Sequence, residues 1–243
     1  GSRKGLVVIG REITALKETE RKLRQSEKMS VLGELAAGIA HEIRNPLTTV
    51  KGFLQMGQVK TIKLDQHIDV LVDEIDRINN IVNELLVIAN PTDVIFTNHN
   101  INTVVRDVVE ILSIEASLNN IQLNVIDKDQ FNTYCNESKL KQVFINIVKN
   151  ALEAISSDGE VTITIADKNE DYFSINFEDN GCGIAENHLK HIGEPFYSVK
   201  ENGTGLGMTV CLSIIETHKG SIHITSQVNS GTSVEVLLPK SKV

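Results

Sequence analysis

A histidine beside a carboxylate is the first feature of the sequence that could carry chemistry. His41 and Glu42 stand in the string HEIRNPL, with Asn45 and Pro46 about one helical turn further on. A neutral imidazole is a nucleophile near pH 7, and an adjacent carboxylate can accept its proton while the other ring nitrogen attacks phosphorus. A solitary His-Glu pair is usually a solvated surface pair, but the Asn-Pro that follows favours a phosphoryl acceptor. Because Pro46 cannot donate to the carbonyl of Glu42, we expect the helix to bend one turn beyond His41.

Two further groups of residues suit a phosphorylated ligand and its metal ion. Asn146 and Asn150 lie four residues apart, so both amides share one helical face, and a carboxamide oxygen is an acceptable ligand for Mg²⁺. The glycines of NGTGLGM precede a helical run, where amide hydrogens and the helix dipole attract anions. Their spacing matches neither GxGxxG nor a Walker A loop, which disfavours a dinucleotide fold. The string EDNGCGI, taken alone, is typical of a hairpin turn.

The histidine belongs to a helical region that extends from residue 11 to about residue 90. Few glycines and prolines interrupt it, and the apolar periodicity predicts two long helices separated near residues 57–63. The second helix carries one apolar stripe, made of Ile68, Leu71, Ile75, Ile78, Val82, Leu85 and Leu86. Two helices alone leave much apolar surface exposed, so we expect an antiparallel helical hairpin that dimerises into a four-helix bundle.

The pattern changes after ANPTD, residues 89–93. Short β-rich runs at 121–126, 160–166, 172–178, 221–226 and 232–239 alternate with helical stretches near 102–119, 137–156 and 207–218. Two hairpin-like pairs favour a largely antiparallel sheet with helices on one face. The second region is therefore predicted to be an α+β domain rather than a doubly wound parallel sheet.

Composition narrows the class of partner and the cellular setting. The net charge is −8 and no Lys/Arg-rich run occurs, which argues against nucleic acid as a partner. The three cysteines are widely spaced and form no CxxC pair, as expected for reduced thiols. No apolar stretch approaches the roughly 20 residues of a membrane-spanning helix. We expect this fragment to be cytoplasmic, which leaves open whether its parent protein is anchored in a membrane.

The string HEIRNPL resembles the H box of sensor histidine kinases, the enzymes of two-component systems. The chain then shows, in the order of that family, matches to the N box (QVFINIVKNALEA), the DxGxG box (EDNGCGI), the F box (EPFYSVK) and the G2 box (NGTGLGM). The resemblance implies that His41 is the phosphoacceptor and that Glu42 assists phosphotransfer. It also implies that Asn45 positions water when the same protein dephosphorylates its partner.

The resemblance further implies ATP and Mg²⁺ as cofactors, bound by a domain of the type found in Hsp90. In that family pattern Asn150 holds the metal ion, Asn146 supports it, and Asp179 accepts a hydrogen bond from the adenine amino group. Phe196 anchors a nucleotide lid, and Lys200 could reach a phosphate. The remaining implied nucleotide contacts are Gly181 and Gly183 at the base, and Gly203, Thr204, Gly205, Leu206 and Gly207 around the triphosphate.

The same resemblance divides the chain and implies its partners. The implied divisions are the end of a PAS-like sensor domain (1–10), a coiled signalling helix (11–28), a dimerisation and phosphotransfer domain (29–90), a linker (91–98) and the catalytic ATP-binding domain (99–243). A homodimer is expected through the bundle. The receiver domain of a separate response regulator should dock near His41, and the bundle is also a candidate target for a protein inhibitor.

Two alternatives remain at this point. An ATPase of the same superfamily would have a glutamate where this chain has Asn146, and a non-catalytic scaffold should have lost at least one box, although none is missing. His188 and His191 share a helical face, but without a third ligand nearby they are interpreted as surface residues. Within the kinases, the sequences HEIRNPLTTVKGFLQ and PFYSVKENGTGLGM most resemble those of sporulation kinases of spore-forming bacilli.

Overall fold

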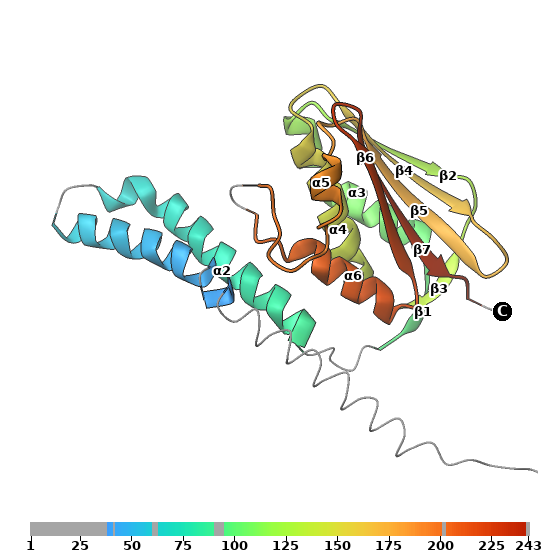
Figure 1. Cartoon of the computed structure of the whole chain (residues 1–243), viewed down its shortest axis with the longest axis horizontal. Coiled ribbons are helices and arrows are strands. Elements are labelled where there is room, and N and C mark those ends of the chain that lie inside the picture. Colours follow the sequence, from blue (N-terminus) through green and yellow to red (C-terminus); the bar gives the residue numbers. More distant parts are fainter. Residues whose placement is uncertain (1–37, 41, 60–62, 90–94, 201–202, 242–243) are drawn as a thin grey trace, which may run out of the picture.

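The computed structural model describes residues 38–40, 42–59, 63–89, 95–200 and 203–241. Figure 1 shows a helical hairpin followed by a domain in which helices cover one side of a sheet. The expectations for residues 1–28, and for the placement of His41, lie outside the described residues. Among the helices described, none has the length and apolar content that a bilayer-spanning helix needs.

The first hairpin helix comprises residues 38–40 and 42–58, and it includes Pro46 without a break in the described part. After the turn, the short 3-10 helix η1 (Leu64–His67) leads into α2 (Ile68–Ala89). The rings of Phe53 and His67 lie 5.0 Å apart across this turn. The two helices run side by side in opposite directions (Figure 1), which confirms the predicted hairpin.

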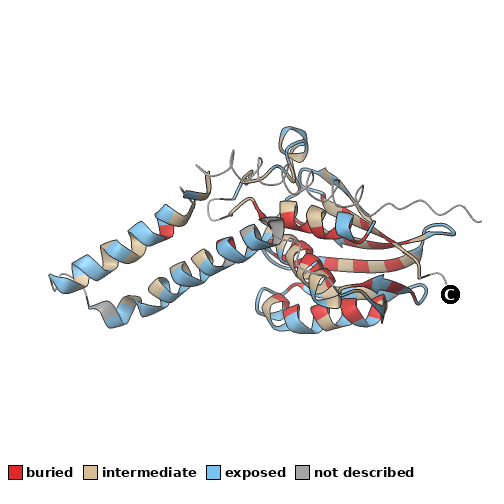
Figure 2. Ribbon diagram, turned by 90° about the horizontal axis from the view of Figure 1, so that it is seen from below, coloured by how far each residue is buried: buried red, intermediate tan, exposed pale blue. Residues whose placement is uncertain are grey.

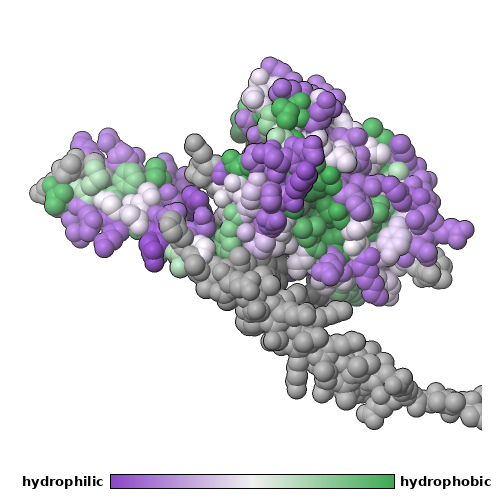
Figure 3. Space-filling model, in the orientation of Figure 1, coloured by the Kyte–Doolittle hydropathy of each residue, from purple (hydrophilic) through white to green (hydrophobic). Residues whose placement is uncertain are grey.

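One face of the hairpin exposes large apolar side chains. They recur at intervals of three, four and seven residues, which is the spacing of a helix-packing seam. The exposed residues that follow this spacing are Leu47, Leu54, Ile68, Val72, Ile75, Val82 and Leu86, and Met56, Val59 and Val70 are exposed outside it. Figure 2 shows few buried residues in the hairpin, and Figure 3 shows apolar patches on its surface.

The second domain is built on a five-stranded sheet with the order β2-β4-β5-β7-β6. Strands β2 and β4 are parallel, and every other neighbouring pair is antiparallel. The strands are β2 (Gln122–Asp127), β4 (Glu160–Asp167), β5 (Tyr172–Asp179), β6 (Ser221–Gln227) and β7 (Gly231–Pro239). Helices α3 (Ile101–Leu118), α4 (Glu137–Ala154) and α6 (Gly207–Thr217) cover one face (Figure 1). The α+β prediction is confirmed.

Three short elements of the second domain were not predicted from the sequence. Strands β1 (Thr97–Asn100) and β3 (Asn132–Cys135) form a separate antiparallel pair, and α5 (Glu186–Leu189) is a single helical turn. The sequence of β1, TNHN, is entirely polar and has no alternation, so periodicity could not reveal it.

Helix α4 explains how the sequence builds the core. Asn136 caps it, since its side chain accepts a hydrogen bond from the Lys139 backbone N–H at 2.9 Å. Its apolar residues recur on one face and are buried where the helix contacts the sheet: Leu140, Val143, Phe144, Ile147, Val148, Ala151 and Leu152. This buried face fixes α4 in place, so the polar residues between the apolar ones are held on its other side.

Candidate functional site

Helix α4 is the element that brings the predicted nucleotide motifs together. Three of its positions lie four residues apart, and each contacts a different motif. Asn146 meets the start of α6, Asn150 meets the segment after Phe196, and the backbone of Ala154 meets the loop after Asp179. Because residues spaced by four lie along one side of a helix, the motifs line one side of α4.

The loop after β5 holds a partly buried carboxylate. Oδ1 of Asp179 accepts hydrogen bonds from the backbone N–H groups of Gly181 at 2.8 Å and Thr232 at 3.3 Å. Burial raises the pKa of Asp179 above its usual value, although these two donors act in the opposite direction. With Oδ1 fixed in this way, Oδ2 has no hydrogen-bond partner within the described residues. This oxygen is suited to accept from an amino group of a ligand.

Backbone contacts hold this loop against α4 and the β6–β7 turn. The N–H of Cys182 donates to the Ala154 carbonyl at 3.0 Å, and the Cys182 carbonyl accepts from the Asn229 N–H at 2.8 Å. A Cβ on Gly181 would lie 2.7 Å from the Ala154 carbonyl oxygen, so a side chain there would force the loop away from the helix. Gly183 lies in the same loop, next to the backbone of Gln227.

The segment that carries Phe196 and Lys200 crosses the same side of α4. The Phe196 N–H donates to the Gly205 carbonyl at 3.1 Å, and Gly205 has a φ of 67°, which favours glycine. Gly203 lies against Ser198 in this segment. Lys200 Nζ donates to Asn150 Oδ1 at 2.8 Å and also contacts the carboxylate of Glu153. The predicted phosphate-binding lysine and the predicted metal ligand are therefore in direct contact.

The G2 motif leads directly into α6, which begins at Gly207. Leu206 is fully buried in the core, and its N–H donates to Thr204 Oγ1 at 3.3 Å. Leu206 can therefore contribute to a ligand site only through its backbone. A Cβ on Gly207 would lie 2.8 Å from Asn146 Nδ2, so the first turn of α6 packs closely on the predicted N box.

This set of groups fits a magnesium nucleotide. The ammonium of Lys200 at Asn150 Oδ1 shows that a cation can reach this carboxamide oxygen. The first amide hydrogens of α6 suit phosphate oxygens, and the carboxylate of Asp179 suits an exocyclic amine. Asn150 would hold the metal ion, with Asn146 beside it.

The H box occupies the first hairpin helix. Glu42 Oε2 lies 3.7 Å from Arg77 Nη2 of α2, and neither Glu42 Oε2 nor Arg77 Nε has a hydrogen-bond partner within the described residues. Asn45 is exposed. The ring of Phe196 lies 3.4 Å from the position of a Cβ on Gly38, so the Phe196 segment contacts this helix three residues before His41.

Three neighbours of the predicted site were missed in the sequence. Glu153 could have been found from its place three residues after Asn150 on the same helix. Arg77 and Cys211 come from other elements, and nothing in their local sequence indicates Glu42 or Asn146 as their partners.

The two histidines interpreted as surface residues have local partners. His188 Nδ1 lies 2.5 Å from the Tyr197 hydroxyl, and His191 Nδ1 lies 3.0 Å from Glu194 Oε1. Within the part of the chain that the structure describes, no group of three or more His, Cys, Asp or Glu side chains is arranged to hold a metal ion.

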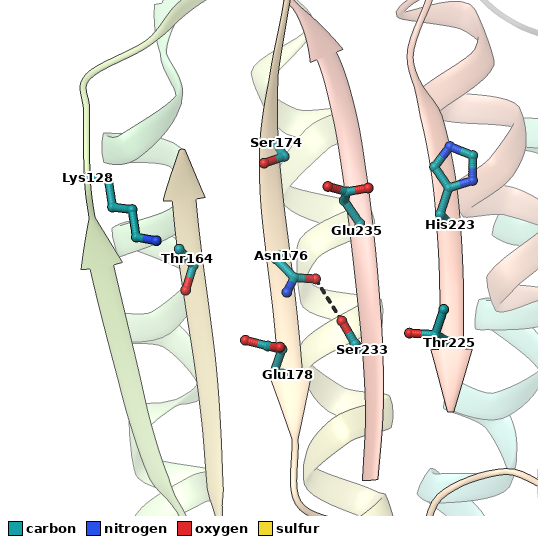
Figure 4. Close-up of a pocket in the computed structure, with 9 residues that line it drawn as sticks. All are labelled: Lys128, Thr164, Ser174, Asn176, Glu178, His223, Thr225, Ser233 and Glu235. Carbon is teal, nitrogen blue, oxygen red and sulfur yellow. Dashed lines mark hydrogen bonds between the residues drawn. The ribbon is translucent and has the colours of Figure 1, made fainter. Parts of the chain in front are cut away.

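A shallow pocket of about 420 Å³ lies on the sheet face opposite the helices (Figure 4). Ser233 donates to Asn176 across it at 2.9 Å. Its lining is polar throughout and consists of Lys128, Thr164, Ser174, Asn176, Glu178, His223, Thr225, Ser233 and Glu235. None of the predicted site residues lines it, and a polar outer face is the usual solvent side of such a sheet.

Two family models match the chain. Residues 31–93 match the His Kinase A (phospho-acceptor) domain. Residues 135–242 match the histidine kinase-, DNA gyrase B- and HSP90-like ATPase. The first match spans the H box and the hairpin, and the second spans every nucleotide motif described above.

Curated relatives and solved structures agree with these matches. Sporulation kinase E of Bacillus subtilis (strain 168) is 42% identical over 96% of this chain and 32% of its own length, and sporulation kinase C of the same strain is 43% identical over 90% and 52%. The chain thus spans about a third to a half of these relatives. A crystal structure of histidine kinase ThkA in complex with response regulator protein TrrA has a TM-score of 0.80 at 29% identity, covering 95% of this chain and 68% of that one.

Proposed function

Because the chain belongs to the sensor histidine kinases, we propose that it autophosphorylates His41 from Mg·ATP and passes the phosphoryl group to an aspartate of a separate response regulator. The observation that carries this proposal is the convergence of three nucleotide motifs on one side of α4. Chance matches in sequence would not be expected to meet along one helix.

The nucleotide roles follow from the groups that meet there. Asp179 accepts from the adenine amino group, with the loop of Gly181 and Gly183 against the base. The start of α6, from Thr204 to Gly207, offers amide hydrogens to the phosphates. Asn150 would hold Mg²⁺, which would neutralise phosphate charge and orient the transferred group.

Lys200 contacts the residue that we assign to the metal ion. Its ammonium bonds the Asn150 oxygen that we assign to the metal ion. A metal ion at Asn150 would take the place of this ammonium. Lys200 would then be available for a phosphate oxygen, and the segment that carries it would act as a lid.

In the transfer step, the lone pair of one His41 ring nitrogen forms a bond to the γ-phosphorus. The bond from that phosphorus to the β–γ bridging oxygen breaks, and ADP leaves. Glu42 accepts the proton from the other ring nitrogen. Arg77 lies beside Glu42 and holds its carboxylate on the side of α2.

The remaining roles depend on partners. The ThkA structure contains a response regulator, which supports docking of such a protein near His41, where Asn45 is exposed. We assign Asn45 to water positioning in dephosphorylation of that regulator. The exposed hairpin seam supports a homodimer and would also suit a protein inhibitor of the bundle. Similarity to sporulation kinases of Bacillus subtilis supports a role in a sporulation phosphorelay.

The test is incubation with γ-labelled ATP and magnesium. We expect label on the wild type that is labile in acid and stable in alkali, as a phosphohistidine is, and no label on His41→Gln. His67→Gln is the matched control, because His67 lies at the other end of the same hairpin against Phe53, and it should keep the label. Label that persists in His41→Gln, or an unlabelled wild type that still binds Mg·ATP, would refute the proposal.

A further inference from the structure

A buried cysteine on α6 contacts the N box. Cys211 is 1% exposed, and its Sγ accepts a hydrogen bond from Asn146 Nδ2 at 3.1 Å. The same sulfur lies 3.9 Å from the Val143 carbonyl oxygen, to which its S–H donates weakly. The hydrogen bonds therefore run in one direction, from the amide of Asn146 to the thiol of Cys211 and on to the backbone of α4.

A glycine closes the other side of the Asn146 carboxamide. A Cβ on Gly207 would lie 2.8 Å from Asn146 Nδ2 and 3.0 Å from Oδ1. Gly207 and Cys211 are four residues apart, so successive turns of α6 enclose the amide. The space beside Gly207 lets the carboxamide approach α6, and its amino end donates to Cys211 one turn further along.

We propose that Cys211 is a positioning residue that fixes the orientation of the Asn146 carboxamide in the nucleotide site, an inference that rests on the proposed function. With its amino group committed to the sulfur, Asn146 presents its oxygen to the ligand. An oxygen attracts a hydrated cation, whereas an amino group in its place would repel it. Cys211 thus sets the sign of the partial charge that Asn146 offers, without touching the ligand.

The proposal predicts a selective effect on magnesium. In Cys211→Ala the amide loses its partner and can rotate end for end, so the magnesium concentration for half-maximal labelling of His41 should rise about 3- to 10-fold, as expected for a lost neutral hydrogen bond. Cys211→Ser keeps a hydroxyl that accepts and donates in the same directions, and it should restore the wild-type value within about 2-fold.

A matched cysteine separates positioning from packing. Cys135 is also a fully buried free thiol, but it lies on β3, opposite Thr97 of β1. Cys135→Ala should lower stability without changing the magnesium dependence. If Cys211→Ala and Cys135→Ala change the magnesium dependence equally, or if Cys211→Ser fails to restore it, Cys211 has only a packing role and the proposal is overturned.

A double-mutant cycle tests the route through Asn146. Binding of Mg·ATP is measured by calorimetry for wild type, Cys211→Ala, Asn146→Ala and the double variant, so the result does not depend on phosphotransfer. The effect of Cys211→Ala should vanish once Asn146 is alanine, and an undiminished effect overturns the inference. If the two substitutions are coupled in Mg·ATP binding but the wild type shows no label on His41, the inference would be supported and the proposed function refuted.

Discussion

The helical hairpin and the ATP-binding domain both carry periodic apolar patterns, yet they differ in whether the apolar positions are buried. In the ATP-binding domain the periodic positions are covered by the chain itself, and Leu238 of β7 is 0% exposed. In the hairpin, Ile75 occupies a comparable position in its stripe and is 49% exposed. The pattern is therefore satisfied within the chain in one domain, and in the other it needs a second surface.

This difference matches what each region has to do. The nucleotide site depends on fixed distances around α4, which a closed core can maintain. The proposed function requires the hairpin to present His41 to the ATP-binding domain and to a regulator, so most of its surface must stay accessible. An exposed apolar seam on such an element is suited to a symmetric partner, because the same seam recurs on the second copy.

The largest effect on stability is expected for a substitution in the buried core of the ATP-binding domain. Leu238→Ala should lower the free energy of unfolding of the ATP-binding domain by about 2–5 kcal/mol, since it removes buried methyl groups and leaves a cavity. Leu118→Ala, at a position 80% exposed on α3, should change it by less than about 0.5 kcal/mol. Chemical denaturation followed by circular dichroism measures both, at low and at high protein concentration.

The concentration dependence is the informative part of that experiment. A core completed within one chain should lose the same free energy at every protein concentration. If the loss in Leu238→Ala grew on dilution, the ATP-binding domain would also depend on a partner, and the contrast with the hairpin would fail.

The next largest effect is expected at the seam. Ile75→Asp would place a carboxylate in the seam of the proposed dimer and should weaken that dimer about 100-fold, or by about 3 kcal/mol. Ile114→Asp makes the same change at a position 72% exposed on α3, outside the hairpin, and should leave the dimer intact. Sedimentation equilibrium gives both dissociation constants. Equal weakening by the two variants would place the interface elsewhere.

Sequence patterns predicted the elements that bury apolar residues. The five strands of the main sheet and helices α3, α4 and α6 lie within two residues of the predicted ranges, because alternation and helical spacing report burial directly. Strands β1 and β3 were missed, since a polar four-residue strand is formed by its pairing partner rather than by its own pattern.

The candidate site also contains residues that the sequence predicted and residues that it did not. The motif residues could be named from the sequence because their types suit phosphate, metal and base. Their neighbours could not, since Cys211 reaches Asn146 only after α6 packs on α4, and Arg77 reaches Glu42 only after the hairpin closes. Contacts between elements depend on the fold, and a single sequence without that fold does not display them.

A smaller effect concerns a buried histidine in the ATP-binding domain. His218 follows α6, where its Nδ1 donates to the Ile214 carbonyl at 2.7 Å and its Nε2 accepts from the Asn136 N–H at 3.0 Å. Its ring also lies 4.8 Å from that of Phe96. The neutral imidazole thus joins the end of α6 to the start of α4, the two helices that enclose Asn146. A proton on Nε2 would oppose the Asn136 donor.

Burial lowers the pKa of His218 from its ordinary 6.5, although the Ile214 carbonyl acts in the opposite direction. Between the folded pKa and 6.5 the unfolded chain therefore binds more protons, so the free energy of unfolding should fall as pH decreases below about 6.5. His218→Gln, which supplies a donor and an acceptor without titrating, should flatten this decline, while His67→Gln in the hairpin should not. Denaturant titrations at a series of pH values decide this, and a decline of unchanged slope in His218→Gln would assign the pH sensitivity to another group. The expected result would place the pH response in the closed core, at the junction that aligns the nucleotide site, and would separate it from the association of the hairpin.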